Sequence, residues 1–206
     1  MGAPRRERWI TFVDAVLHRE LCQRAAQVPL RAIATGAILH GRLGGDRPEL
    51  EGTVGERDEH VSAWEHMAVL ECARGTRLAD LYLSHAVTTR DQWTVLAAWL
   101  RWARERDEVL EHGAMAGGDP SKGEPYAFVH ALPGRALVAA RNPSDREKIL
   151  ALPVDAPPFL FARDRTIDWT SAYPDKGAGA VKPGAAWSVV LPPFGVRVVE
   201  MKAVSD

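Results

Sequence analysis

The spacing of apolar residues divides this chain into a helix-rich first part and a strand-rich second part. In the first part apolar residues recur mainly at intervals of three and four, which is typical of amphipathic helices. In the second part short apolar runs alternate with turns rich in Pro and Gly, which is typical of antiparallel strands. The composition changes to Gly, Asp, Pro, Ser and Lys at Gly113–Pro125. We therefore expect two regions, 1–115 and 123–206.

Strands and helices are expected to alternate in the first part. The expected strands are Trp9–Phe12, Leu30–Thr35 and Thr76–Leu83. Helices are expected from about Asp14, from Glu56 and from Thr89, where Thr89 and Gln92 fit a capping box. Gly75 is a plausible residue to end the second helix. This alternation predicts parallel βα units, the closing arc of a (β/α)8-type barrel whose other units lie elsewhere. The alternative is a compact helical half in which the runs at 30–35 and 78–83 are extended connections.

The second part is expected to be an antiparallel β-sandwich. Its predicted strands are Tyr126–Leu132, Arg135–Arg141, Glu147–Leu152, Thr166–Tyr173, Trp187–Leu191 and Val196–Met201. The first two form a hairpin around Pro133-Gly134. After Arg141, the residues Asn142-Pro143-Ser144-Asp145 predict a reversal of the chain, because Pro143 moves Asn142 out of the helical region and the other side chains can bond the local backbone. Taken alone, such hairpins occur in any antiparallel β domain.

Composition and charge narrow the possible partners. The chain has 206 residues, 46% of them apolar and 26% charged, and a net charge of −1. A near-neutral chain lacks the electrostatic footprint of a nucleic-acid or acidic-membrane binder. Cys22 and Cys72 have no metal-ligand spacing and predict neither a zinc site nor a disulfide framework. No apolar run has the length of a membrane span or a signal peptide, so we expect a cytoplasmic protein if Met1 is the natural start.

Several segments, taken together in order, resemble the C-terminal end of bacterial glycoside hydrolases of the melibiase (α-galactosidase-like) kind. They are Trp99–Leu110, Gly117-Gly118-Asp119-Pro120, Glu124-Pro125-Tyr126, Arg141-Asn142-Pro143-Ser144 and Leu191–Glu200. The resemblance implies an α/β barrel followed by an all-β C-terminal domain. It also implies a catalytic carboxylate pair on the middle barrel strands, and no Asp or Glu of this chain matches those positions. No cofactor is implied.

Residues that follow barrel strands face the substrate. On this basis His40, Asp46 and His85 are candidate contacts for sugar hydroxyls, although His and Asp in a Gly-rich loop more often support turns. Trp169 is a weaker candidate for stacking on a sugar, since packing is the commoner role of Trp.

Two other sets of polar residues are better explained by structural roles than by metal binding or catalysis. His60, Glu65 and His66 match no known metal-ligand motif and indicate a solvated helix face. Asp14, with His18 and Glu20 nearby, could form an acid/base set, but it is better explained as a helix N-cap.

The sequence supports two hypotheses of different classes. In the first, the chain is the C-terminal part of a glycoside hydrolase, catalytically incomplete alone, whose partners are a carbohydrate and the missing N-terminal barrel region. In the second, it is a non-catalytic carbohydrate-binding or structural interaction module. Whether the chain is itself an enzyme is left open by the residues.

Overall fold

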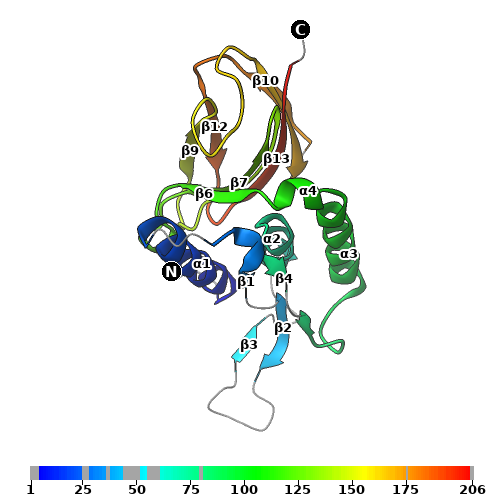
Figure 1. The fold of residues 1–206 in the computed structure, drawn as a ribbon. Coiled ribbons are helices and arrows are strands. Elements are labelled where there is room, and N and C mark those ends of the chain that lie inside the picture. Colours follow the sequence, from blue (N-terminus) through cyan, green and yellow to red (C-terminus); the bar gives the residue numbers. More distant parts are fainter. Residues whose placement is uncertain are drawn as a thin grey trace.

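The computed structural model describes residues 5–24, 28–35, 38–43, 52–54, 61–78, 81–174 and 176–204. A layer of helices lies across one end of a β-sandwich, with a small group of short strands on the far side of the helices (Figure 1). The helices are α1 (Arg5–His18), α2 (Val61–Ala73), α3 (Arg90–Glu105) and α4 (Asp107–Leu110), with a π-helical turn at Arg19–Gln23 and 3₁₀ turns at Leu30–Ala32 and Pro120–Lys122. In the described part of the chain, no helix is long and apolar enough to cross a bilayer.

Helix α1 replaces the strand expected at Trp9–Phe12, and that prediction was wrong. Ile10, Asp14 and Leu17 recur at helical spacing, and all three are buried. Burial of this one face explains why the segment is helical despite the β-branched and aromatic residues at 9–12. Asp14 lies within the helix and is therefore not its N-cap.

Four short strands form two parallel pairs beside α2. They are β1 (Ala34–Thr35), β2 (Ile38–Leu43), β4 (Arg77–Leu78) and β5 (Leu81–Leu83). β1 pairs in parallel with β4, and β2 pairs in parallel with β5. The end of β2 also forms an antiparallel ladder with β3 (Gly52–Val54). Because α2 connects the two members of each pair, the segment is a βαβ crossover, as the alternation of strands and helix predicted. Only the end of the expected strand at 30–35 is extended, since residues 30–32 form a 3₁₀ turn.

The capping box of the third helix is confirmed. The Thr89 side chain accepts a hydrogen bond from the Gln92 backbone N–H, and the Gln92 side chain accepts one from the Thr89 N–H. After α2 the backbone of Gly75 has a φ of 76°, the left-handed conformation that ends helices.

The second part forms a six-stranded and a two-stranded antiparallel sheet. Its strands are β6 (Gly113–Gly117), β7 (Tyr126–Leu132), β8 (Arg135–Arg141), β9 (Lys148–Pro153), β10 (Ile167–Tyr173), β11 (Ala178–Val181), β12 (Ala186–Leu191) and β13 (Val196–Ala203). The larger sheet has the order β11-β10-β13-β8-β7-β6, and β12 pairs with β9. All six predicted strands are present, while β6 and β11 were not predicted.

Each face of the larger sheet covers a separate core. Tyr126, Phe128 and Val198 face the helices and pack with α1 and α2 residues. Their neighbours along the strands, such as Val129 and Val199, face the two-stranded sheet and pack with its residues. The larger sheet is thus the middle layer between helices and the second sheet, and the first of these interfaces contains the polar network described next.

Candidate functional site

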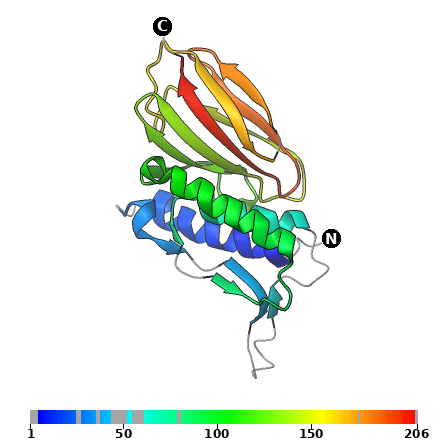
Figure 2. The ribbon, with the colours of Figure 1, turned by 90° about the vertical axis from the view of Figure 1, so that its right-hand side faces the viewer.

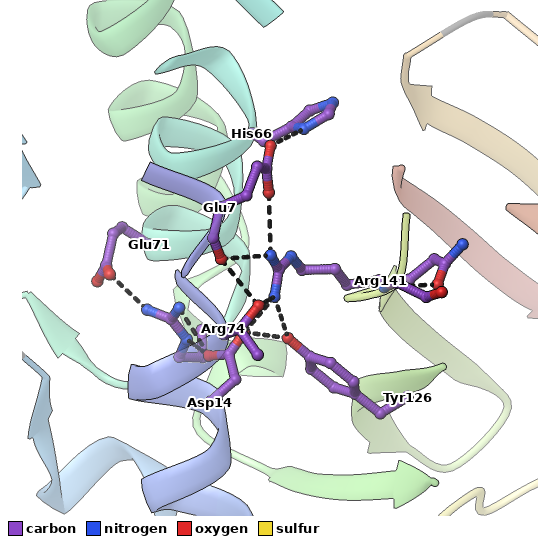
Figure 3. A network of polar contacts seen from close by, with 10 residues as sticks. Glu7, Asp14, His66, Glu71, Arg74, Tyr126 and Arg141 are labelled. Carbon is purple, nitrogen blue, oxygen red and sulfur yellow. Dashed lines mark hydrogen bonds and ion pairs between the residues drawn. The ribbon is translucent and has the colours of Figure 1, made fainter. Parts of the chain in front are cut away.

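A buried polar network joins α1 and α2 to the hairpin β7–β8 (Figure 3). The figure labels the members Glu7, Asp14, His66, Glu71, Arg74, Tyr126 and Arg141. Glu7 and Asp14 come from α1, and His66 and Glu71 come from α2, which Arg74 directly follows. Tyr126 and Arg141 are cross-strand partners in β7 and β8. The network therefore draws on segments more than 100 residues apart.

Arg141 is fully buried and is the link between α1 and the sheet. Its Nη2 donates to Oε2 of Glu7 at 2.9 Å and to the Glu7 carbonyl at 3.1 Å. Its Nη1 donates to the Thr11 hydroxyl at 3.0 Å and to the Tyr126 hydroxyl at 3.1 Å. A guanidinium with this many acceptors fixes the angle at which α1 meets the strands.

Arg74 links α1 to α2, as Arg141 links α1 to the sheet. Its Nε and Nη2 approach Oδ1 of Asp14 at 2.8 and 2.7 Å, and its Nη1 pairs with Glu71. The guanidinium also lies 5.7 Å from the centre of the Phe128 ring. Tyr126 completes the arrangement by donating its hydroxyl to Asp14.

Burial and neighbouring groups shift the pKa values of Glu7, Arg74 and Tyr126. Burial acts to raise the pKa of Glu7, but hydrogen bonds and charge from His66 and Arg141 outweigh it and lower the pKa. Burial acts to lower the pKa of Arg74, yet Asp14 and Glu71 raise it. Burial raises the pKa of Tyr126, so its hydroxyl stays protonated.

The network's carboxylates are not available for proton transfer to a ligand. Glu7, Asp14 and Glu71 have exposed fractions of 3%, 0% and 4%. Each is also paired with an arginine. A general acid or base must reach the reacting group within hydrogen-bonding distance, which these enclosed side chains cannot do. The network is structural and holds the two helices on the sheet. Asp14, which the sequence assigned to a helix N-cap, belongs to this network instead.

The structure places the predicted sugar contacts in different surroundings. His40 is 1% exposed; its Nδ1 lies 3.0 Å from Arg6 Nη2, and its ring meets Trp64 edge-on at 6.0 Å. It is thus enclosed by α1 and α2. His85 is exposed, in the turn after β5. Asp46 lies outside the described residues. A role for any of the three in sugar binding stays a prediction.

The remaining candidates are partly buried. His66 Nδ1 lies 3.1 Å from a Glu7 carboxylate oxygen, and Glu65 accepts a hydrogen bond from the Tyr173 hydroxyl at 3.2 Å. These two residues therefore do not form the solvated face that we expected, and His60 is outside the described residues. Trp169 is half-buried and packs over Gly179. Among the residues described, no group of three or more His, Cys, Asp or Glu side chains is placed to hold a metal ion.

Comparison with known proteins adds evidence from the fold. No protein-family model matches the chain, and no curated protein matches its sequence. A Bacillus halodurans protein assigned as an α-N-acetylgalactosaminidase matches 97% of this chain with a TM-score of 0.61 and 14% identity. A GH27 β-L-arabinopyranosidase from Geobacillus stearothermophilus matches equally well, with 97% coverage, a TM-score of 0.61 and 14% identity.

A GH36 α-galactosidase from the same organism matches 93% of the chain with a TM-score of 0.59 and 16% identity. The chain has the fold of part of these glycoside hydrolases. It spans 44%, 43% and 25% of the three proteins' lengths, in the order given. The structural resemblance to melibiase-like enzymes, expected from the sequence motifs, is therefore confirmed.

Proposed function

We propose that this chain is the C-terminal part of a glycoside hydrolase, in which it closes a (β/α)8-type barrel and supports the sugar site with a β-sandwich. The observation that carries the proposal is the fold match over 97% of the chain, which includes both the helical part and the sandwich. A common β-sandwich alone would match only the second part. The carbohydrate partner and the barrel partner both follow from this proposal.

The parallel strand pairs support the barrel part of the proposal. Within the described residues, β5 pairs only with β2, so its other edge can accept a further parallel strand. Tyr82 in β5 is 58% exposed and Leu81 is 46% exposed. In a closed (β/α)8 barrel every strand has a neighbour on both sides, and its side chains are covered inside by the other strands and outside by the helices. A preceding set of βα units would supply both.

The catalytic carboxylate pair is assigned by this proposal to the barrel region outside the chain. Retaining glycosidases need two carboxyl groups about 5–5.5 Å apart and open to the sugar. The enclosed carboxylates of Glu7, Asp14 and Glu71 do not meet the second requirement. Asp46, which follows β2 in the sequence, and His85, in the turn after β5, would provide secondary contacts to substrate hydroxyls, and His40 would support the base of the site.

The proposal is tested by comparing this chain with the gene product of its source cells. The purified chain should not hydrolyse para-nitrophenyl α-galactoside, β-L-arabinopyranoside or N-acetyl-α-galactosaminide. An antibody raised against residues 123–206 should capture a product much larger than 22.6 kDa that hydrolyses at least one of them.

Two outcomes would count against the proposal. A captured product of 22.6 kDa without activity would favour a carbohydrate-binding or structural module. Hydrolysis by the isolated chain, abolished by changing one of its own carboxylates to the amide, would show that the catalytic pair is within it.

A further inference from the structure

An open groove lies on the larger sheet where the helical layer ends. It has a volume of about 630 Å³, within the range of ligand sites, and it is distant in sequence from the predicted sugar contacts. Figure 2 shows this face of the sheet rising beyond α3, with β13 and β10 crossing it. Val109 of α4 and Leu137 of β8 are buried together at its lower wall. The groove thus has an aliphatic wall beside an exposed polar sheet surface.

The polar surface of the groove is built by strand register. Arg135, Lys202 and Asp168 are direct cross-strand partners on β8, β13 and β10. The next row on the same face is Leu137, Glu200 and Thr170. Cross-strand neighbours have Cβ atoms about 4.5–5.5 Å apart, so donors and acceptors alternate over short distances on this surface. The row beyond that is buried under the helices, which explains where the groove stops.

Some of these charged groups are held in place, whereas others are open to a ligand. Arg106 approaches Glu200 with Nε and Nη2, both at 2.7 Å, and lies 4.8 Å from the centre of the Trp102 ring. By contrast, Asp168, Thr170 and Lys202 are exposed, and their side chains have no hydrogen bond or ion pair with any described residue. A carboxylate, a hydroxyl and an ammonium therefore lie close together, none of them paired with another side chain in the described part of the chain.

We propose that this groove binds a neutral oligosaccharide. The charges in and beside it balance: Arg106, Arg135 and Lys202 against Glu108, Asp168 and Glu200. This balance disfavours strongly anionic or cationic ligands. Vicinal sugar hydroxyls both donate and accept, so one pair can bind Asp168 and Lys202 together.

Saturation-transfer NMR with raffinose and maltotriose as probes tests this site. The method observes signals of the sugar, so it requires no particular oligomeric state of the 206-residue chain. We expect saturation of ring protons with at least one probe at ~20 mM, which suits millimolar affinity. Asp168→Ala and Lys202→Ala should each weaken binding about tenfold, a change of roughly 1.4 kcal/mol. Ser188→Ala, on an exposed position of β12, is the matched control and should bind as the wild type does.

The site is rejected if neither probe is saturated by the wild type, or if Asp168→Ala and Lys202→Ala bind as well as Ser188→Ala does. Thermal unfolding of the variants should coincide with that of the wild type, because the substituted side chains are exposed. The result is independent of the barrel proposal, since the groove is formed by the sheet and the α3–α4 junction. A negative NMR result therefore does not affect the outcome of the hydrolysis assay, and a negative hydrolysis assay does not affect the NMR result.

Discussion

Arg141 reaches from the end of β8 to Glu7 in α1, with Nη2 and Oε2 2.9 Å apart and both side chains buried. The pair holds the helical layer on the sheet. Removing only the cation would leave Glu7 buried without its charge partner, which costs about 3–5 kcal/mol in comparable cases. We therefore expect Arg141→Met to lower the free energy of unfolding by that amount in urea denaturation.

Arg135, at the other end of the same strand, provides the matched control. It also pairs with a glutamate, Glu108, at 2.6 Å, but the two side chains are 48% and 76% exposed. Exposed pairs of this kind contribute about 0–1 kcal/mol. Arg135→Met should therefore change stability little. Equal effects of the two substitutions would contradict a special role for the buried pair.

His130 predicts a pH dependence of stability. It is fully buried in β7, and its Nε2 donates to the Ala73 carbonyl at 3.0 Å. Burial lowers the pKa of His130 to about 4, whereas the unfolded chain titrates near 6.5. Between these values only the unfolded chain binds the proton, so stability is lost as the pH falls from about 6.5 to about 4, by on the order of 3 kcal/mol.

The measurement is the free energy of unfolding across that pH range for the wild type and His130→Gln. The wild type should show the steeper slope. Protonation of Glu7 also destabilises the folded state in acid, because its pKa is lower in the folded than in the unfolded chain. This loss occurs at lower pH than that of His130, and it is the same in the wild type and in His130→Gln. Parallel slopes in the two proteins would mean that His130 does not titrate as its burial implies.

Asn142 fastens the turn after β8 to the loop before β13. Its Nδ2 lies 3.1 and 2.9 Å from the carbonyls of Leu191 and Pro192 and 2.7 Å from that of Arg146, and its Oδ1 accepts from the Ser144 N–H. Asn142→Ala would leave buried backbone acceptors unsatisfied and should cost about 2 kcal/mol in chemical denaturation.

Asp145 in the same turn is the control for Asn142, because it is exposed. Asp145→Ala should stay within about 0.5 kcal/mol of the wild type. A loss as large as that of Asn142→Ala would indicate that the turn tolerates no substitution, and that the bonds of Asn142 are not the cause.

Gly75 is predicted to resist substitution for two physical reasons. Its φ of 76° disfavours other residues, and a Cβ there would meet the His130 ring and the Leu110 carbonyl. Gly184 has a similar φ of 73° but open space around it. Gly184→Ala should therefore cost about 1 kcal/mol, and Gly75→Ala about 3 kcal/mol, because backbone strain and overpacking add. Equal shifts in thermal unfolding would exclude the steric contribution of His130.

The sandwich was largely predictable from sequence because most of its strands are short apolar runs between well-marked turns of Pro and Gly. The hairpin Tyr126–Leu132 and Arg135–Arg141 has the predicted bounds. The two missed strands, β6 and β11, are edge strands made chiefly of Ala and Gly. Their residues have low intrinsic strand preference, and pairing with β7 and β10 determines their conformation.

The polar network could not be derived from sequence, since its members pair across long separations. The available signal was Arg141 at the end of a small apolar strand and Arg74 directly after an apolar helix. A charged residue next to an apolar strand or helix indicates that the charge is buried against an opposite charge, but it does not identify the residue that supplies that charge. Assigning Asp14 to a helix cap followed a local rule, whereas tertiary pairing with Arg74 decided its role.

The position of β13 in the larger sheet has a consequence for synthesis of the protein. This strand, Val196–Ala203, is last in sequence among the strands but pairs with β8 on one side and β10 on the other. Until it has left the ribosome, both neighbours lack their shared partner and the sheet remains in two pieces. We therefore expect the sandwich to complete its folding only after this strand has been translated, with one edge of β8 and one edge of β10 unpaired until then.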